Sequence, residues 1–334
     1  MPQRIVLIQP CCIGDVILAT ATLTALRRGY PTAHIAWAVG SWARAAIENH
    51  PLLDAIIDTG TTANPAKNPL KLARQLHGFD LAVSLVRSPW MSVAVLLSGI
   101  PQRAGLSSGW RGFGYNIRVS INPYEARHEA QIYLDVPRAL GIDVNGCYAN
   151  VPADLTALNG YSLPARYIVI NPCGGQNPGM EMSIKRWLPQ NFAALGQRLT
   201  TDLNADIILL GGPGDQAIVE AVQTYLDKPA RAFIGELSFP QIAALAAQSQ
   251  IYIGNDTGLT HLAAAAGART VMILGPSDPA RYAPFTPHSL AIWKPTPLKR
   301  GGVASGTPEN WSWERDGISV EAAYQQIIEW LAHP

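Results

Sequence analysis

The amino-acid sequence predicts an α/β protein built from two parallel-sheet domains. Short apolar runs, which are typical of buried strands, alternate along the chain with stretches of helical apolar spacing. This alternation stops at a polar, proline-containing segment, residues 143–164, and then starts again. The chain has 334 residues, which is too long for one ordinary core and suits two domains.

The first half opens with a strand and a helix joined by a tight turn. Residues 4–9 contain a continuous apolar run, and the helix predicted at 16–28 ends in two arginines, which suit the negative end of the helix dipole. Further strands are predicted at 35–39, 55–57 and 81–85, and further helices at 43–49, 64–77, 92–98 and 126–140. Residues 105–116 hold four glycines and are predicted to form a long loop, of a kind that is often functional.

The second half repeats the pattern. Strands are predicted at 167–171, 206–210, 251–253 and 270–274, and helices at 191–199, 217–226, 239–247, after the turn 254–258 up to 266, and at 320–331. We place the domains at 1–155 and 156–316, with a C-terminal helix in 317–334. Two such halves predict a cleft between them, and ligands of such sheets bind at the carboxyl ends of strands, against helix N-termini.

Composition narrows the class of protein. A net charge of +1 without a long basic run argues against a general nucleic-acid binder. No apolar run reaches the length of about 18 residues that a transmembrane helix needs, and the N-terminus has no signal-peptide pattern, so we expect a cytoplasmic protein. The four cysteines lack zinc-site spacing and are expected to be reduced and buried. These are Cys11, Cys12, Cys147 and Cys173.

Several cofactor and nucleophile motifs are missing from the sequence. No Gly-x-Gly-x-x-Gly follows the first strand, and neither a Walker loop nor a Gly-x-Ser-x-Gly elbow occurs anywhere. No aspartate pair has metal-ligand spacing. We therefore expect a reaction that needs neither a cofactor nor a metal ion.

The turn after the first strand carries the first candidate residue. Gly14 permits a tight turn there, and Asp15 follows it at the carboxyl end of the strand. A carboxylate in this position can accept a proton from an attacking hydroxyl. An ordinary helix cap or first-turn aspartate explains the same residue, and the sequence leaves both interpretations open.

A second group of candidates surrounds the start of a later helix. Residues 254–261 follow a strand and open an alanine-rich helix, so small residues would let a diphosphate approach backbone N–H groups at the positive helix end. The hydroxyls of Thr257 and Thr260 could donate to it, with His261 facing the same space. Alternatively, Asp256 and Thr257 only cap the helix, and His261 lies on the surface.

Two further segments offer weaker signals. Lys185 and Arg186 follow a glycine-rich loop and could neutralise a departing diphosphate, or they could be a solvated basic pair beside Trp187. Residues 211–215, which include Gly212, could form the edge of a nucleoside pocket or only a turn between strand and helix.

Taken together, these segments resemble the bacterial heptosyltransferases of glycosyltransferase family 9, which have the two-domain GT-B fold. The resemblance covers nearly the whole chain and rests on the following segments: Gly14-Asp15 with the helix ending at Arg27, Phe79-Asp80-Leu81, Lys185-Arg186-Trp187, Asp256-Thr257-Gly258 with His261 to Ala264, and residues 275–281. It implies an inverting transfer of a sugar, from ADP-heptose or a similar donor, to a hydroxyl of a glycan, lipid-linked or small-molecule acceptor.

The resemblance also assigns roles. It implies that Asp15 is the base and that Lys185 stabilises the diphosphate. It implies a donor site formed by Gly14, Ser183, Gly212, Asp256, Thr257, Gly258, Leu259 and His261. The first domain would be the acceptor side, the second would bind the donor, and the last helix would cross back to pack on the first domain. Any membrane contact would be peripheral, on the inner face.

The sequence departs from the family pattern at one loop, and two other functions are compatible with it. The loop 173–184 lacks the usual Ser/Thr pair near the phosphates, and only Ser183 is close. A nucleotide-sugar epimerase can use the same fold and would need no acceptor. A non-catalytic sugar-nucleotide binding protein is a third possibility, although it would need no base.

Overall fold

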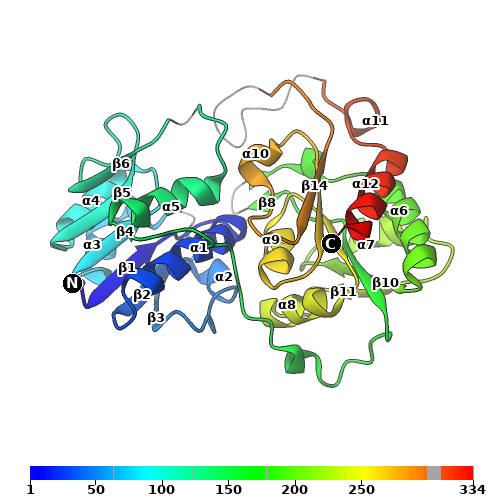
Figure 1. Cartoon of the computed structure of the whole chain (residues 1–334), viewed down its shortest axis with the longest axis horizontal. Coiled ribbons are helices and arrows are strands. Elements are labelled where there is room, and N and C mark those ends of the chain that lie inside the picture. Colours follow the sequence, from blue (N-terminus) through cyan, green and yellow to red (C-terminus); the bar gives the residue numbers. More distant parts are fainter. Residues whose placement is uncertain (63, 123, 178–179, 299–309, 334) are drawn as a thin grey trace. The chain divides into compact units, whose positions relative to one another are not determined.

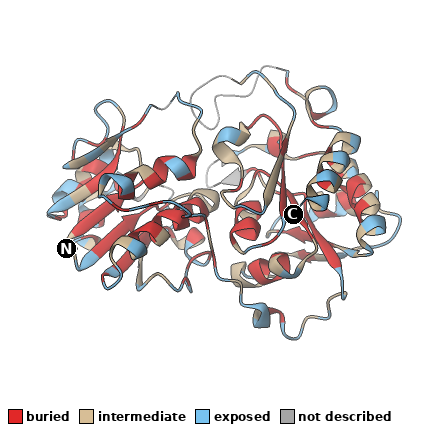
Figure 2. Ribbon diagram, viewed as in Figure 1, coloured by how far each residue is buried: buried red, intermediate tan, exposed pale blue. Residues whose placement is uncertain are grey.

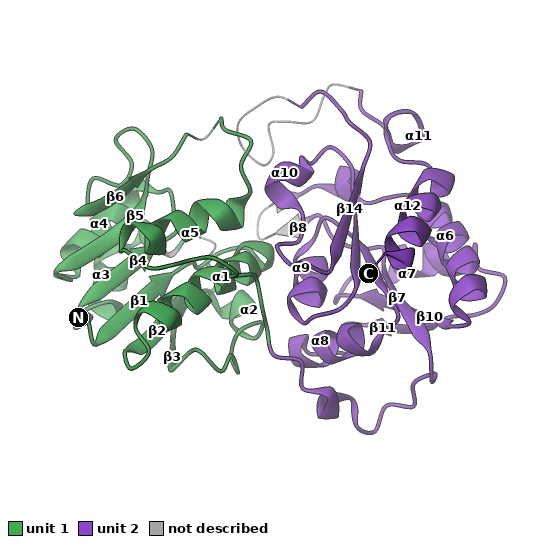
Figure 3. Ribbon diagram, in the orientation of Figure 1, with its two compact units in different colours: residues 1–151 green, residues 152–334 purple. Residues whose placement is uncertain are grey.

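A computed structural model describes residues 1–62, 64–122, 124–177, 180–298 and 310–333. The chain divides into two compact units, Met1–Val151 and Pro152–Pro334 (Figure 3). The division falls just before the boundary at 155 that the sequence suggests. Each unit has its own sheet and its own helices, so each is described separately (Figure 1).

The first unit is a six-stranded sheet in which every pairing is parallel, flanked by helices. Its strands, in spatial order, are β3 (Ala55–Asp58), β2 (His34–Val39), β1 (Arg4–Ile8), β4 (Leu81–Ser84), β5 (Gln102–Ser107) and β6 (Ile117–Ser120). Its helices are α1 (Ile13–Gly29), α2 (Ser41–Arg44), the 3-10 helix η1 (Pro65–Lys67), α3 (Pro69–Gln75), α4 (Pro89–Leu97) and α5 (Glu129–Ala139).

Burial explains why the central elements of this unit form where they do. Ile5, Val6, Leu7 and Ile8 of β1 are all fully buried, as expected for a parallel strand that is covered on both faces (Figure 2). Helix α1 buries ten of its residues and packs on α5. The apolar run of β1 and the helical apolar spacing of α1 therefore both mark residues that are buried in the core of this unit.

The second unit repeats this architecture. Its strands, in spatial order, are β11 (Arg231–Ile234), β10 (Asp206–Gly211), β7 (Tyr167–Asn171), β12 (Tyr252–Asn255), β13 (Thr270–Leu274) and β14 (Ser289–Trp293). All five pairings are parallel. The helices are η2 (Leu155–Leu158), η3 (Ser183–Lys185), α6 (Pro189–Leu203), α7 (Gln216–Gln223), α8 (Phe239–Gln248), α9 (Gly258–Ala265), α10 (Pro279–Tyr282), α11 (Trp313–Asp316) and α12 (Val320–Ala332); β8 (Gln176–Asn177) and β9 (Met180–Glu181) form a separate hairpin.

Both sheets change direction at one place. In the first unit the chain runs outward from β1 to β3, then returns to β4 beside β1 and runs outward the other way. In the second unit the same change occurs between β7 and β12. At such a switch point the connections leave toward opposite faces and open a crevice at the carboxyl ends of the strands. Each unit therefore has one favoured place for a ligand.

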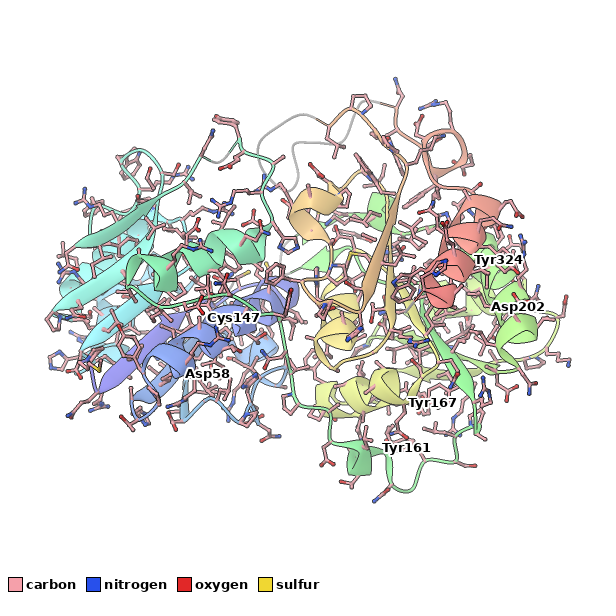
Figure 4. The ribbon with its side chains drawn as sticks, in the orientation of Figure 1. Asp58, Cys147, Tyr161, Tyr167, Asp202 and Tyr324 are labelled. Carbon is pink, nitrogen blue, oxygen red and sulfur yellow. The ribbon has the colours of Figure 1, made fainter. Side chains whose placement is uncertain are left out.

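The C-terminal helix belongs to the second unit. Helix α12 packs against α6 and β14 of that unit (Figure 1), and its packing on the first domain stays a prediction. Ala323 and Ile327 are fully buried in the core of that unit. The hydroxyl of Tyr324 donates to Asp202 of α6 at 2.7 Å, and both residues are labelled in Figure 4. The apolar face of α12 is therefore buried within its own unit.

Other differences concern short or edge elements. The predicted loop at 105–116 includes the last residues of β5, and the edge strand β6 follows it. The edge strands β11 and β14 were not predicted; both are short, and most of their residues are only partly buried or exposed. The helix predicted at 43–49 is one short turn, α2, followed by turns.

Candidate active site

Asp15 lies in the first turn of α1, at the carboxyl end of β1 and thus at the switch point of the first sheet. The N-cap of this helix is Cys12, which makes no capping hydrogen bond through its side chain. Asp15 is therefore not the cap residue, although its first-turn position does suit the helix dipole. Its Oδ1 accepts a hydrogen bond from the hydroxyl of Tyr133, on α5, at 2.8 Å.

Tyr133 is a buried proton donor that the sequence did not single out. Its side chain is 3% exposed, and its hydroxyl also accepts a hydrogen bond from Gln9 at 3.4 Å. Burial raises the pKa of Tyr133 well above its ordinary value, and the negative charges of Asp15 and Glu129 add to this effect. The phenol is therefore protonated at neutral pH and donates to Asp15.

An ion pair lies beside this hydrogen bond. Arg87, just after β4, contacts the buried carboxylate of Glu129 at 3.2 Å. Burial works against the charge on Arg87, but Glu129, Tyr133 and Asp15 together raise its pKa. Since β4 lies next to β1, Arg87 and Asp15 follow neighbouring strand ends. That topological argument is the signal which could have found Arg87, but it needs the strand order.

In the second unit, Lys185 and Asp256 form a buried ion pair. Lys185 Nζ donates to Asp256 Oδ2 at 2.6 Å, and the two side chains are 11% and 7% exposed. Burial alone would raise the pKa of Asp256, but Lys185 outweighs it and, with His261 and Ser277, holds the pKa below its ordinary value. Lys185 is thus not a solvated surface cation, and its charge is already balanced by a neighbour.

The ion pair lies at the start of α9, where β7 and β12 end side by side. Thr257 is the N-cap, and its hydroxyl accepts a hydrogen bond from the N–H of Leu259 at 3.2 Å. Gly174 has a φ of +117°, and a Cβ there would lie 2.0 Å from the side chain of Thr257. The glycine thus lets the loop after β7 approach the helix start closely. Gly258 is the first residue of the helix.

Thr260 and His261, two of the side chains predicted to face the diphosphate, are buried. Thr260 is fully buried and donates to the carbonyl of Asn255 at 2.7 Å, so its hydroxyl is not a ligand donor. His261 is 5% exposed, so the interpretation of this residue as a surface histidine is wrong. The positive charge that His261 can carry acts on Asp256. The first-turn N–H groups of a helix have no partner within the helix and remain the better phosphate donors.

Two further predicted residues are Ser183, which lies two residues before Lys185, and Gly212. Ser183 is exposed and begins the short helix that ends at Lys185. The N–H of Gly212, after β10, donates to Asp215 at 2.9 Å, as expected for a turn between strand and helix. Trp187 fixes the segment that carries Ser183 and Lys185, because its backbone N–H donates to Asn255 and its indole N–H donates to the carbonyl of Ile318.

The described part of the chain contains neither a metal-binding cluster nor a membrane-spanning helix. No group of three or more histidine, cysteine, aspartate or glutamate side chains among these residues has a geometry that could hold a metal ion. No helix among them is both long and apolar enough to cross a bilayer.

Comparison with known proteins gives concordant results. The lipopolysaccharide heptosyltransferase 3 of Escherichia coli K12 is 26% identical over 307 residues, which cover 84% of this chain and 85% of the relative. The lipopolysaccharide heptosyltransferase 2 of the same strain is 26% identical over 334 residues, with coverage of 91% and 92%.

Solved structures share the architecture. The E. coli ADP-heptose LPS heptosyltransferase II superposes with a TM-score of 0.77 at 20% identity, covering 98% of each chain. The E. coli heptosyltransferase WaaC with ADP gives a TM-score of 0.72 at 16% identity, covering 98% of this chain and 99% of the other. At these identities the likeness shows the fold, GT-B. The model of glycosyltransferase family 9 (heptosyltransferase) matches residues 70–301. Because this match spans more than half of the chain and includes parts of both units, the protein belongs to glycosyltransferase family 9.

Proposed function

We propose that this glycosyltransferase moves a heptose from ADP-heptose to a hydroxyl of a lipopolysaccharide core or similar glycan, with inversion and without a metal ion. The names of the relatives support the sugar and the acceptor class. The structural neighbour with ADP supports the nucleotide. A cytoplasmic location with at most peripheral membrane contact is part of the same proposal. The observation that carries the mechanism is the hydrogen bond from Tyr133 to Asp15 at the switch point of the first sheet.

Asp15 acts on the acceptor. A sugar hydroxyl holds its proton tightly at neutral pH and is a poor nucleophile until a base takes that proton. Tyr133 donates to Asp15 Oδ1 and so fixes the carboxylate, which accepts the acceptor proton. One base on the acceptor side gives a single displacement, and the anomeric centre is inverted.

The second unit acts on the leaving group. A departing diphosphate needs charge stabilisation, which a helix N-terminus and a cation can supply. An ammonium has three donors, and the bond to Asp256 uses one of them, so Lys185 keeps others for the donor. We assign Asp256 the task of orienting Lys185, and Thr257, Gly258 and Leu259 the task of presenting the start of α9 to the phosphates.

The test is a panel of ADP-, GDP-, UDP- and dTDP-sugars, screened first by thermal shift. A ligand present at about 100 times its dissociation constant stabilises the fold by about 2.7 kcal/mol, which gives a clear shift. The selected donor is then incubated with heptose-accepting glycans. Nucleotide should be released only when an acceptor is present, and the product should have the inverted anomeric configuration by NMR.

Three results would count against parts of the proposal. Turnover of the donor without any acceptor would indicate an epimerase. Retention of configuration would exclude a single displacement with Asp15 as the base. Loss of activity with a chelator, restored by a divalent cation, would exclude a reaction that needs no metal.

A further inference from the structure

Two neighbouring cysteines occupy the turn that leads to Asp15. Cys11 Sγ and Cys12 Sγ lie 2.9 Å apart, between β1 and α1. Both thiols are reduced and partly exposed, whereas Cys147 and Cys173 are reduced and buried. The sulfurs are farther apart than the ~2.05 Å of a disulfide but closer than ordinary non-bonded sulfurs. The pair thus corrects the expectation that all four cysteines are buried, and it is open to small reagents.

The surroundings make the two thiols unequal. The hydrogen bond from Cys12 lowers the pKa of Cys11, and this effect outweighs burial and the negative charge of Asp15. The same hydrogen bond, burial and Asp15 raise the pKa of Cys12 far above its ordinary value. Both thiols lie at the N-terminal end of α1, which favours a thiolate. We assign Cys11 as the nucleophile, and Cys12 keeps its proton until a later step.

The backbone between them is already unusual. Cys12 has a φ of +66°, a value found at only three non-glycine residues of the described chain. A residue with a Cβ disfavours this region, which is retained where the surroundings hold it. In this conformation the two side chains of adjacent residues lie on the same side, with their sulfurs in contact.

We propose that Cys11 and Cys12 are a redox-reactive pair, which a peroxide converts to a disulfide between adjacent residues, and that this bond reversibly disables the turn bearing Asp15. The thiolate of Cys11 attacks one peroxide oxygen, the O–O bond breaks, and the released hydroxide takes a proton to become water. The sulfur of Cys12 then attacks the Cys11 sulfenic acid and loses its proton, and the second hydroxide leaves as water. Two thiols and one hydrogen peroxide thus give one disulfide and two waters.

The bond would be easy to reverse. Adjacent Cα atoms are about 3.8 Å apart, whereas the Cα atoms of ordinary disulfides are about 4.4–6.8 Å apart. A disulfide forced into the shorter span is strained, and strained exposed disulfides are the labile ones. A small dithiol reductant should therefore reopen it quickly.

Closure would act on the catalytic turn. Cys12 is the N-cap of α1, and its carbonyl accepts the first helical hydrogen bond, from Val16 at 2.9 Å. Asp15 lies inside that turn. A change in the Cys12 backbone therefore moves the carboxylate relative to Tyr133, which is fixed on α5. This effect on activity rests on the proposed function, whereas formation of the bond does not.

The experiment measures the bond and the activity separately. The purified protein is treated with hydrogen peroxide, and free thiols are counted in denaturant while peptides are mapped by mass spectrometry. We expect the count to fall from four to two, a peptide containing Cys11 and Cys12 lighter by two hydrogens, and no covalent dimer. Turnover should fall by on the order of 100-fold, the cost of misplacing a catalytic group by about 1 Å, and return with dithiothreitol.

Matched variants control for other damage. In Cys12→Ser, peroxide should leave a sulfenic acid on Cys11 that dimedone traps, because the second thiol is missing. The double variant Cys11→Ser/Cys12→Ser is compared with its own untreated sample, and its turnover should not change on treatment with peroxide. Oxidation of Cys11 to sulfinic acid in the wild-type chain, or no change in thiol count, would overturn the redox pair. Disulfide formation with unchanged turnover would keep the pair but overturn its effect on Asp15. Peroxide-sensitive turnover in the double variant would overturn that effect as well.

Discussion

Replacing Asp15 with asparagine tests the centre of the proposed mechanism. Asparagine keeps the shape of the side chain, and its carbonyl oxygen can still accept the hydrogen bond from Tyr133. It removes only the negative charge and the basicity. A neutral amide cannot take a proton from the acceptor hydroxyl, so the chemical step loses its base.

The expected magnitudes separate catalysis from folding. General-base catalysis contributes typically 10²–10⁴-fold, so turnover should fall by about that factor. The hydrogen bond from Tyr133 becomes a bond between neutral groups, and the first turn of α1 loses an acid. Together these changes should lower the free energy of unfolding by only about 1–2 kcal/mol, because α1 has a different residue as its cap.

The assay compares turnover, donor affinity and urea unfolding for the wild type, Asp15→Asn and a control. Asp80→Asn is a suitable control, because Asp80 accepts hydrogen bonds from backbone N–H groups of Gln3 and Arg4, at the amino end of the same sheet. We expect the control to keep its turnover and both variants to bind donor normally. Turnover of Asp15→Asn within about threefold of wild type, in a folded protein, would remove Asp15 from the mechanism.

Four further outcomes follow from the structure. Tyr133→Phe removes the hydrogen-bond donor to Asp15, so turnover should fall by roughly tenfold, which is the contribution of a hydrogen bond to a charged group. The acidic limb of the pH–rate profile should also move to higher pH. If that limb does not move, Tyr133 is only a packing residue. Asp256→Asn leaves the buried ammonium of Lys185 uncompensated and should cost about 3–5 kcal/mol in urea unfolding, so a loss below about 1 kcal/mol would contradict the burial of this pair. The pKa of Asp256 is lower in the folded than in the unfolded chain, so the stability that Asp256 contributes is complete above about pH 4 and is lost as the pH falls through the folded pKa. Unfolding curves measured between pH 7 and pH 3 should therefore lose less stability in Asp256→Asn than in the wild type. Ile327→Ala should cost about 2–5 kcal/mol, because this side chain of α12 is fully buried in the second unit, and a cost under about 0.5 kcal/mol would refute that packing.

The sequence by itself predicted the two-unit α/β architecture and the central strands. The runs at β1, β7 and β13 are apolar because both faces of these strands are covered, and such a run is visible without any partner. The strand end and helix start around Gly14 and Asp15 were predicted for a similar reason, since both are local events, although Gly14 lies inside α1 and the positive φ of the turn is at Cys12. The edge strand β3 was predicted, whereas the edge strands β6, β11 and β14, which are likewise mostly partly buried or exposed, were missed.

The tertiary structure decided which side chains meet. Tyr133 is 118 residues from Asp15, and Lys185 is 71 residues from Asp256. Neither pairing leaves a periodic trace in the sequence, because a pattern of apolar and polar residues reports that a residue is covered but not what covers it. Helix α12 shows the same limit: its apolar stripe predicted a buried face, and only the folded chain places that face on α6. Burial is a property of one residue and can be estimated locally, whereas a contact joins two residues whose distance depends on the whole fold between them.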